Sequence, residues 1–327
     1  LHELSKTMID LKKYDHLYFV ACGSAYHVGL LAKNLIEKYA RIPCNCEVAS
    51  EFRYNSPILD EKTLVVCISQ SGETADTLAA LRMVNKMGID SCAIVNVKGS
   101  SLEKEAKYVL PTLAGVEVSV ATTKAYCAQV AVCALLALHA SIDHLSSLQI
   151  HTIEKQLLKL DTYIYKLISD TKLDGFVSSI INKKNVFFIG RGMDYALSME
   201  GALKLKEITY IQAVAYPAGE LKHGTISLIE KDTPVMVLIS DEHLVDKSIS
   251  NMKEVKARGA KILLVIREDL YHENIEADEV IFLPKVSEFL QGIVSIVPYQ
   301  LLAHHIAAQM GCDIDQPKNL AKSVTVE

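Results

Sequence analysis

The stretch from Val65 to Leu78, which reads VVCISQSGETADTL, decides the fold of this chain. Its apolar residues stop at a turn rich in hydroxyl groups, and apolar residues then recur at helical spacing. This order predicts a buried strand, a tight turn and the start of a helix. Ser69, Ser71 and Thr74 would converge, with backbone N–H groups, on the positive end of the helix dipole, which suits a phosphate monoester. A single hydroxyl would favour plain helix capping, but three of them favour an anion site.

The same strand–turn–helix pattern occurs earlier in the chain. His16–Ala21 is apolar and ends at Cys22-Gly23-Ser24-Ala25, and a helical pattern follows. Further short strands are expected at Glu47–Val48, Cys92–Val95 and Tyr108–Leu110. Alternating strands and helices predict an α/β fold, a parallel sheet with helices on both faces. In such sheets ligands bind at the carboxyl ends of the strands, where the turns at Ser24 and Ser69 both fall.

The second half of the chain repeats the first. His16–Tyr26 aligns with Asn185–Tyr195, so that Gly23 matches Gly192 at the same offset. This similarity predicts the duplication of a whole domain, because its period far exceeds that of solenoid repeats. The second copy has Ser240-Asp-Glu-His where the first has its hydroxyl turn. Its acidic residues would repel phosphate, so we expect one phosphate site per chain, in the first half.

Length and composition limit the function classes. The 327 residues, half of them hydrophobic, are enough for two domains with cores of their own. The net charge of −5 gives no reason to expect nucleic acid or an anionic membrane as partner. The eight cysteines lack zinc-site spacing and predict free thiols in a reducing, cytoplasmic setting. No metal-ligand cluster is apparent, and no metal or cofactor is expected.

Three features of the chain ends and of the longest apolar run complete this picture. The run from Ala128 to Ala140 is too short to span a bilayer and predicts a buried helix. No signal peptide is expected at the start. Because the sequence begins with Leu1 rather than Met, we expect a piece of a longer protein.

Two segments of the second half carry groups that could do chemistry. Glu200, Lys204 and Glu207 lie at i, i+4 and i+7, which places them on one face of a predicted helix. A solvated face with ion pairs is the alternative, but the position after the Gly190-Arg-Gly turn favours a site. His223 lies in a glycine-bounded segment, Ala215–Gly224, and is an acid–base candidate. A plain surface loop is the alternative there.

The end of the chain, from Asp313 to Glu327, lacks helical or strand periodicity and predicts an ordered tail. It carries Lys322. A lysine on a tail is usually solvated, but a desolvated one could form an imine with a carbonyl group.

These residues resemble those of a known family. The likeness lies in Cys22-Gly23, in the Ser69–Thr77 turn SQSGETADT, in Glu207, in ELKHG at Glu220–Gly224 and in the tail NLAKSVTVE at Asn319–Glu327. Together they resemble the isomerizing glutamine–fructose-6-phosphate aminotransferases, also called glucosamine-6-phosphate synthases. The likeness covers essentially the whole chain and concerns the C-terminal isomerase part of that family, which consists of two sugar isomerase (SIS) domains. The family's N-terminal glutaminase domain is expected to be absent.

The resemblance implies an organisation for the chain. Each SIS domain would be a flavodoxin-like αβα sandwich with a parallel sheet. The expected bounds are 1–145 for the phosphate-binding first domain, 146–180 for a helical connector, 181–312 for the second domain and 313–327 for a tail that completes the active site.

The resemblance also implies a substrate and its binding residues. Fructose 6-phosphate would bind through Glu200, the backbone at Val120 and Ala321, and a phosphate site formed by Ser24, Ser69, Gln70, Ser71 and Thr74.

The implied mechanism needs four catalytic residues. Lys322 would form a Schiff base with the C2 ketone, which ammonia displaces. Glu207 would carry a proton between C1 and C2, with Lys204 assisting, to give glucosamine 6-phosphate. His223 would help to open the sugar ring and would come from the neighbouring subunit, so a homodimer is expected. Without a glutaminase domain the chain should still isomerise fructose 6-phosphate to glucose 6-phosphate.

Two departures and two alternatives accompany the resemblance. The family's turn often reads Cys-Gly-Thr-Ser, so Ala25 has lost a hydroxyl group, and Lys318 stands where an Arg is common. One alternative is another enzyme with two SIS domains, such as a deglycase of fructosamine phosphates, which need not carry Lys322. The other is a sugar-phosphate sensor without catalysis, in which Glu207, His223 and Lys322 would be superfluous.

Overall fold

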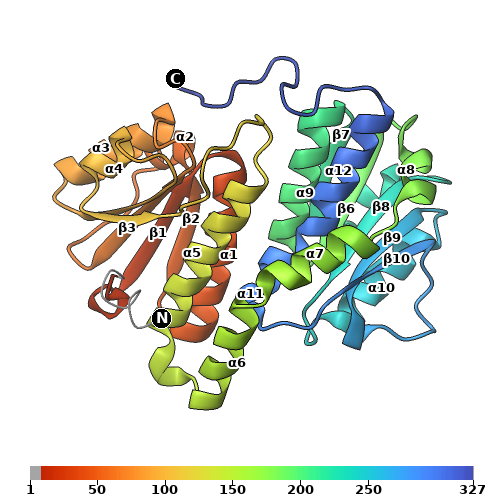
Figure 1. Cartoon of the computed structure of the whole chain (residues 1–327), viewed down its shortest axis with the longest axis horizontal. Coiled ribbons are helices and arrows are strands. Elements are labelled where there is room, and N and C mark those ends of the chain that lie inside the picture. The colour runs from red at the N-terminus through yellow and green to blue at the C-terminus, as the bar shows by residue number, and fades with distance from the viewer. Residues whose placement is uncertain (1–8, 327) are drawn as a thin grey trace. The chain divides into compact units, whose positions relative to one another are not determined.

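The chain divides into two units, and each of them is formed around one five-stranded sheet (Figure 1). The computed structural model describes residues 9–326. The first unit extends to His151 and also includes the tail from Ala321, whereas the second runs from Thr152 to Leu320. Every strand pair in the described residues is parallel. The α/β fold expected from the sequence is therefore confirmed.

The first sheet has the strand order β2-β1-β3-β4-β5, the flavodoxin-like order. Its strands are β1 His16–Ala21, β2 Cys44–Val48, β3 Thr63–Ser69, β4 Asp90–Val95 and β5 Tyr108–Pro111. All seven residues of β3 are buried, as expected for a central parallel strand that is covered on both faces. The chain leaves β1 toward one side of the sheet and β3 toward the other, so the crevice of this fold lies at the ends of these two strands.

Helices cover both faces of the first sheet. Helices α1 and α5 pack side by side on one face, and α2, α3 and α4 cover the other (Figure 1). Their bounds are α1 Gly23–Leu35, α2 Ala49–Phe52, α3 Ala75–Lys86, α4 Ser101–Glu105 and α5 Lys124–Ala140. Helix α1 continues as a π-helical turn at Ile36–Ala40. The apolar run ending at Ala140 is thus the buried helix that the sequence predicts.

The second sheet repeats the first with the order β10-β9-β8-β6-β7. Its strands are β6 Asn185–Gly190, β7 Gln212–Pro217, β8 Pro234–Ile239, β9 Lys261–Arg267 and β10 Glu279–Leu283. Its helices are α7 Leu160–Asp170, α8 Asp174–Ile180, α9 Met193–Thr209, α10 Val245–Lys256, α11 Glu288–Ser295 and α12 Val297–Gln309. Read from β7, the strands correspond one by one to β2, β1, β3, β4 and β5. The predicted duplication is therefore a duplication of topology as well as of sequence.

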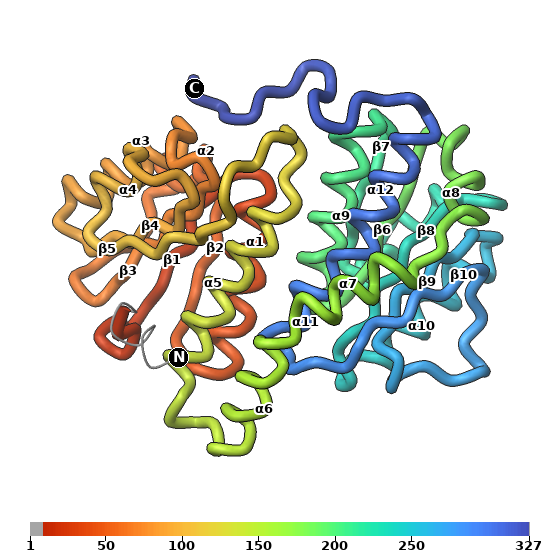
Figure 2. Tube along the Cα trace, in the orientation of Figure 1, coloured from red at the N-terminus to blue at the C-terminus, as the bar shows by residue number. Residues whose placement is uncertain are grey.

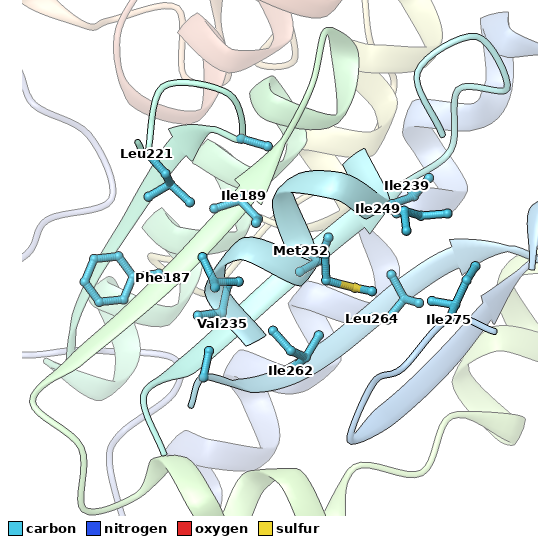
Figure 3. Close-up of a cluster of buried hydrophobic side chains, with 14 of the residues drawn as sticks. Phe187, Ile189, Leu221, Val235, Ile239, Ile249, Met252, Ile262, Leu264 and Ile275 are labelled. Carbon is cyan, nitrogen blue, oxygen red and sulfur yellow. The ribbon is translucent and has the colours of Figure 1, made fainter. Parts of the chain in front are cut away.

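One hydrophobic cluster of the second unit lies between its sheet and α10 (Figure 3). Ile189 of β6, Val235 of β8 and Leu264 of β9 point toward Ile249 and Met252 of the helix, and these five side chains are at most 9% exposed. Burial of such side chains contributes about 1.5–3 kcal/mol each. Burial of the apolar strand residues therefore stabilises the sheet, and the polar residues at the strand ends are not needed for this core.

Several sequence predictions can be compared with this fold. The strand expected at His16–Ala21 is confirmed at both ends, and the aligned segment of the second half forms the corresponding strand β6, whose last residue, Gly190, the sequence analysis places in the following turn. The sequence of residues 1–14 predicts a short polar helix. Residues 1–8 lie outside the described residues, and the rest of this segment contains only a 3₁₀ turn at Leu11–Lys13. The prediction of a helix there is wrong for the described part, because the chain turns extended at Tyr14 before it enters β1.

The remaining helices lie in the connecting region, where the sequence predicts a helical connector. A 3₁₀ turn at Ile142–His144 and helix α6, Ser147–Leu157, precede α7 and α8. Within residues 9–326, every helix is too short or too polar to cross a lipid bilayer. The eight cysteines are free thiols; Cys44, Cys67, Cys92 and Cys133 are buried and the others half-buried.

Candidate functional site

The turn after β3 gathers the hydroxyl groups that the sequence singles out. Ser69 Oγ lies 3.0 Å from Thr74 Oγ1 and accepts a hydrogen bond from the Gly72 amide at 3.0 Å. Ser71 Oγ accepts one from the Glu73 amide at 3.2 Å. Helix α3 begins directly afterwards at Ala75. The turn therefore places side-chain hydroxyl groups and backbone N–H groups around the N-terminus of a helix, which is the arrangement that binds phosphate.

Gly72 makes this tight turn possible. Its φ of +69° lies in the left-handed region, and a Cβ there would lie 2.2 Å from Ser100 Oγ and 2.7 Å from Val95 Cγ2. A side chain at this position would thus be strained and would also collide with the start of α4. Glu73 secures the same contact, because its carboxylate accepts the Ser101 amide at 2.8 Å.

The turn that carries Ser24 lies next to this one. Strands β1 and β3 are neighbours in the sheet, and the last residue pair between them is Ala21 with Ile68. Gly23, with a φ of +54°, starts α1, and Ser24 falls in the first turn of that helix. The structure thus brings Ser24 to the same sheet edge as the β3 turn, as predicted.

The C-terminal tail lies against this unit (Figure 2). The amide of Ala75, the first residue of α3, donates to the Val324 carbonyl at 3.1 Å. Lys322 Nζ lies 2.7 Å from Glu117 Oε2 and 2.6 Å from the Ser119 carbonyl. The tail from Ala321 therefore carries its lysine in the unit that holds the hydroxyl turn.

Glu117 is the residue of this region that the sequence analysis does not identify. Its side chain is 4% exposed and is ion-paired with Lys322. Burial alone would raise the pKa of Glu117, but hydrogen bonds from Lys322, Thr122 and two backbone amides outweigh it and hold the pKa below its ordinary value. No sequence signal marks this carboxylate, because it lies in an irregular loop and its partner is 205 residues away. The nearby Val120 and Ala321, predicted to contact sugar through their backbone, belong to the same unit.

In the second unit, helix α9 carries the predicted charged face. Lys204 Nζ lies 2.5 Å from Glu207 Oε2 and 3.5 Å from Glu200 Oε1. The side chains of Glu200 and Lys204 are 0% and 3% exposed, and that of Glu207 is 21% exposed. Burial disfavours the ammonium, but the two carboxylates outweigh it and raise the pKa of Lys204.

This burial excludes the alternative of a solvated face. Helix α9 is covered by α12, and the absence of a side chain at Gly201 lets the Tyr299 ring approach so closely that a Cβ would lie 2.5 Å from it. Buried charges persist where they are paired. Lys204 is paired on both sides, and the partly exposed Glu207 is the member of the triad that a solute could reach.

His223 and Lys318 lie elsewhere in the second unit. His223 is exposed in the turn after β7, and its amide donates to the Glu220 carbonyl at 3.0 Å. The segment predicted as a loop starts later than expected, because Ala215–Pro217 end β7. Lys318, at the position where an Arg is common, places its ammonium 4.1 Å from the centre of the Tyr210 ring, a cation–π contact.

The predicted residues thus belong to both units. Glu200, Lys204, Glu207 and His223 are in the second unit, and the remaining ones are in the first, namely Ser24, Ser69, Gln70, Ser71, Thr74, Val120, Ala321 and Lys322. A hollow of about 840 Å³ between α7 and β10 contains none of them.

Comparisons with known proteins match the chain to one family. The SIS domain family matches residues 10–139 and 179–310. An isomerizing glutamine–fructose-6-phosphate aminotransferase of Caldanaerobacter subterraneus is 47% identical over 330 residues, which is 100% of this chain and 54% of that protein. One from Clostridium tetani is 46% identical over 99% of this chain and 54% of that protein. The chain therefore spans about half the length of the curated relatives it matches.

Solved structures support the same match. The C-terminal domain of the glucosamine-fructose-6-phosphate aminotransferase from Francisella tularensis is 39% identical, with a TM-score of 0.90, over 97% of this chain and 90% of that one. A glucosamine-6-phosphate deaminase from Thermotoga maritima is 22% identical with a TM-score of 0.74, a likeness that extends to the fold alone.

Proposed function

The chain belongs to the SIS domain family, and on this premise we propose that it is the isomerase part of a glutamine–fructose-6-phosphate aminotransferase. It would convert fructose 6-phosphate and ammonia into glucosamine 6-phosphate. The observation that carries the proposal is the hydrogen bond from the Ala75 amide to the Val324 carbonyl, which holds the tail with Lys322 at the N-terminus of α3, the helix that follows the hydroxyl turn. A sugar whose phosphate lies in that turn would have the lysine amine in the same unit.

The proposed reaction assigns each group a task. The phosphate of the open-chain sugar binds at Ser69, Ser71 and Thr74, and the Lys322 amine forms an imine with its C2 carbonyl. Ammonia then adds to C2 and displaces the lysine amine, which leaves the imine of ammonia at C2 and frees Lys322. This imine acidifies the proton on C1. Glu207 takes that proton and returns it to C2, a transfer that needs one base able to hold it. Lys204, which bonds Glu207 at 2.5 Å, steadies the carboxylate.

Assembly belongs to the same proposal. His223, exposed on its turn, would open the sugar ring in a neighbouring subunit, which requires a homodimer. In the whole enzyme ammonia would come from a glutaminase domain acting on glutamine. The eight free thiols support a reducing, cytoplasmic setting for this chemistry.

The test is turnover of fructose 6-phosphate, followed as glucose 6-phosphate in a coupled dehydrogenase assay, without and with ammonia. We expect glucose 6-phosphate in the first case and glucosamine 6-phosphate in the second. A folded chain that binds the sugar phosphate but yields neither product would overturn the proposal in favour of a sensor.

Replacing the proposed base tests the assignment of Glu207. Glu207→Gln should lower isomerisation about 1000-fold, the loss typical of a removed general base, while fructose 6-phosphate binding changes little. Lys206→Ala is a matched control, since Lys206 is the neighbouring residue of α9 and is exposed. If Glu207→Gln isomerised the sugar as well as that control, another group would be the base.

A further inference from the structure

We propose that Glu117 is a positioning residue for this reaction. Its carboxylate would hold the Lys322 nitrogen at the place where the imine forms. It would also balance the positive charge that this nitrogen carries both before and after imine formation. This inference rests on the proposed function, in which Lys322 is the imine-forming amine. It concerns a residue that neither the sequence motifs nor the family match identifies.

The contact between the two side chains is direct. Lys322 Nζ lies 2.7 Å from Glu117 Oε2, and its second contact is the Ser119 carbonyl at 2.6 Å. Glu117 is 4% exposed and Lys322 27% exposed, so the pair is largely shielded from water. A largely buried ion pair of this kind fixes the positions of its two side chains far more firmly than an exposed surface pair does. The lysine is therefore fixed at its head group and not only through the tail backbone.

The two carboxylate oxygens of Glu117 accept hydrogen bonds from different groups. Oε1 accepts the amides of Thr123 and Ala125 at 3.0 and 3.1 Å, at the start of α5. Oε2 accepts the Thr122 hydroxyl at 2.7 Å together with Lys322. The first oxygen anchors the carboxylate to a 17-residue helix, whose N-terminus favours a negative charge. The second is thereby held in a set place for the lysine.

The charge balance of imine formation fits this arrangement. When a lysine ammonium condenses with a ketone, the nitrogen forms a bond to the carbonyl carbon and the carbon–oxygen bond breaks. Two of the nitrogen's three protons leave with the oxygen as water, and the third stays on the iminium. The nitrogen carries one positive charge before and after, so an ionised Glu117 has a matching partner in both states. The hydrogen bonds that keep its pKa low keep it ionised at neutral pH.

Borohydride trapping tests this role. Borohydride reduces the iminium to a stable secondary amine, so mass spectrometry of the Lys322 peptide after incubation with fructose 6-phosphate measures how fast the imine forms. Glu117→Gln retains an oxygen for the amides of Thr123 and Ala125 but removes the charge. We expect its trapping rate and its isomerisation rate to fall about 100-fold, the loss typical of a misplaced reacting group, with fructose 6-phosphate affinity changed less than about threefold.

Two further variants separate positioning from folding. Glu117→Asp keeps the charge but shortens the side chain by one methylene, so it should recover part of the rate. Glu105→Gln is the matched control, because it removes a carboxylate that pairs with Arg82 at 2.7 Å on the surface of the same unit, and it should trap at the unsubstituted rate.

The outcomes distinguish this inference from the function on which it rests. No adduct on Lys322 in the unsubstituted chain would overturn the proposed function and this role with it. A normal adduct there, together with trapping by folded Glu117→Gln at the rate of Glu105→Gln, would overturn the role of Glu117 alone. If Glu117→Gln did not fold, trapping by Glu117→Asp at the full unsubstituted rate would overturn it equally.

Discussion

The turns after β3 and β8 occupy the same place in two copies of one fold, yet they use their polar groups in opposite ways. The first turn presents Ser69, Ser71 and Thr74, whose hydroxyl groups bond mainly to one another and to the amides of the turn itself. At the second turn a buried carboxyl group from the neighbouring helix is already in place. Asp194 accepts both the amide and the hydroxyl of Ser240, at 2.8 and 2.5 Å.

Other charged groups complete the second turn. The Arg267 guanidinium donates to the Ser240 carbonyl at 3.0 Å and pairs with Asp269 and Glu242. The hollow beside this turn is about 170 Å³. It is lined by three carboxylates, Asp241, Glu242 and Glu288, and also by His243 and Arg267. A phosphate would meet those carboxylates there, and the Arg267 guanidinium is already paired with Glu242 and Asp269. The duplicated fold therefore supplies a place for an anion site, and the side chains decide whether the site exists.

The largest effect, on fructose 6-phosphate affinity, should come from introducing the acidic side chain of the second turn at the corresponding position beside the first turn. Ala25 aligns with Asp194, so Ala25→Asp would direct a carboxylate from the first turn of α1 toward the β3 turn. It would compete for the donors of the turn and repel the phosphate dianion, because like charges in contact destabilise a complex by several kcal/mol. We expect fructose 6-phosphate to bind more than about 100-fold more weakly in isothermal titration calorimetry.

The control for this change is Ala25→Asn, which has nearly the same size and no charge. It should weaken binding far less than Ala25→Asp. Equal affinity of the aspartate variant and the unsubstituted chain would mean that the phosphate does not bind at this turn.

The sequence predicts the parallel sheets and the approximate positions of the two turns. Apolar strands that end in turns, at Ala21 and Ser69, identify a parallel sheet, since burial on both faces requires continuous apolar runs. Alignment of the halves also locates the second turn, but one residue late. Phe19 pairs with Val66 and its counterpart Phe188 with Met236, and this register places Ser240 opposite Gln70 rather than Ser69.

Contacts between distant residues are what the sequence does not reveal. Glu117 and Lys322 are far apart in the chain, and neither periodicity nor spacing connects them. Likewise, the i, i+4, i+7 spacing predicts that Glu200, Lys204 and Glu207 share a face, but their burial depends on α12 and on the contact of Tyr299 with Gly201. Packing between helices and strands decides which charged residues become buried or paired, and a local sequence pattern does not predict that packing.

A smaller effect, on stability, should follow from a side chain at Gly72 in the first turn. Gly72→Ala would introduce strain at a φ of +69° and a Cβ 2.2 Å from Ser100 Oγ. Backbone strain and overpacking together should lower the free energy of unfolding by about 3 kcal/mol in urea titrations. Gly99→Ala is the control, since its φ is +79° but no atom lies within 4 Å of its Cβ, and it should lose only the backbone part. Similar losses in the two variants would show that the turn tolerates a side chain.

The smallest effect should appear in the second turn, as a dependence of stability on pH. Complete burial raises the pKa of Asp194 to about 7, although its bonds to Ser240 oppose the rise. The unfolded chain releases this proton near pH 4, so between pH 4 and pH 7 the folded state binds it and the unfolded state does not. The free energy of unfolding should therefore decrease as the pH rises, by about 2 kcal/mol between pH 5 and pH 7.

Asp194→Asn isolates this contribution in urea titrations at the two pH values. Its amide can donate to the Ser240 hydroxyl and accept the Ser240 amide, so it mimics the protonated acid, and the decrease should disappear. An unchanged decrease in the variant would assign the pH dependence to another group and would mean that Asp194 is ionised beside Ser240. The second turn would then hold a permanent negative charge, and repulsion alone, without the internal hydrogen bonds of a neutral acid, would account for its difference from the first.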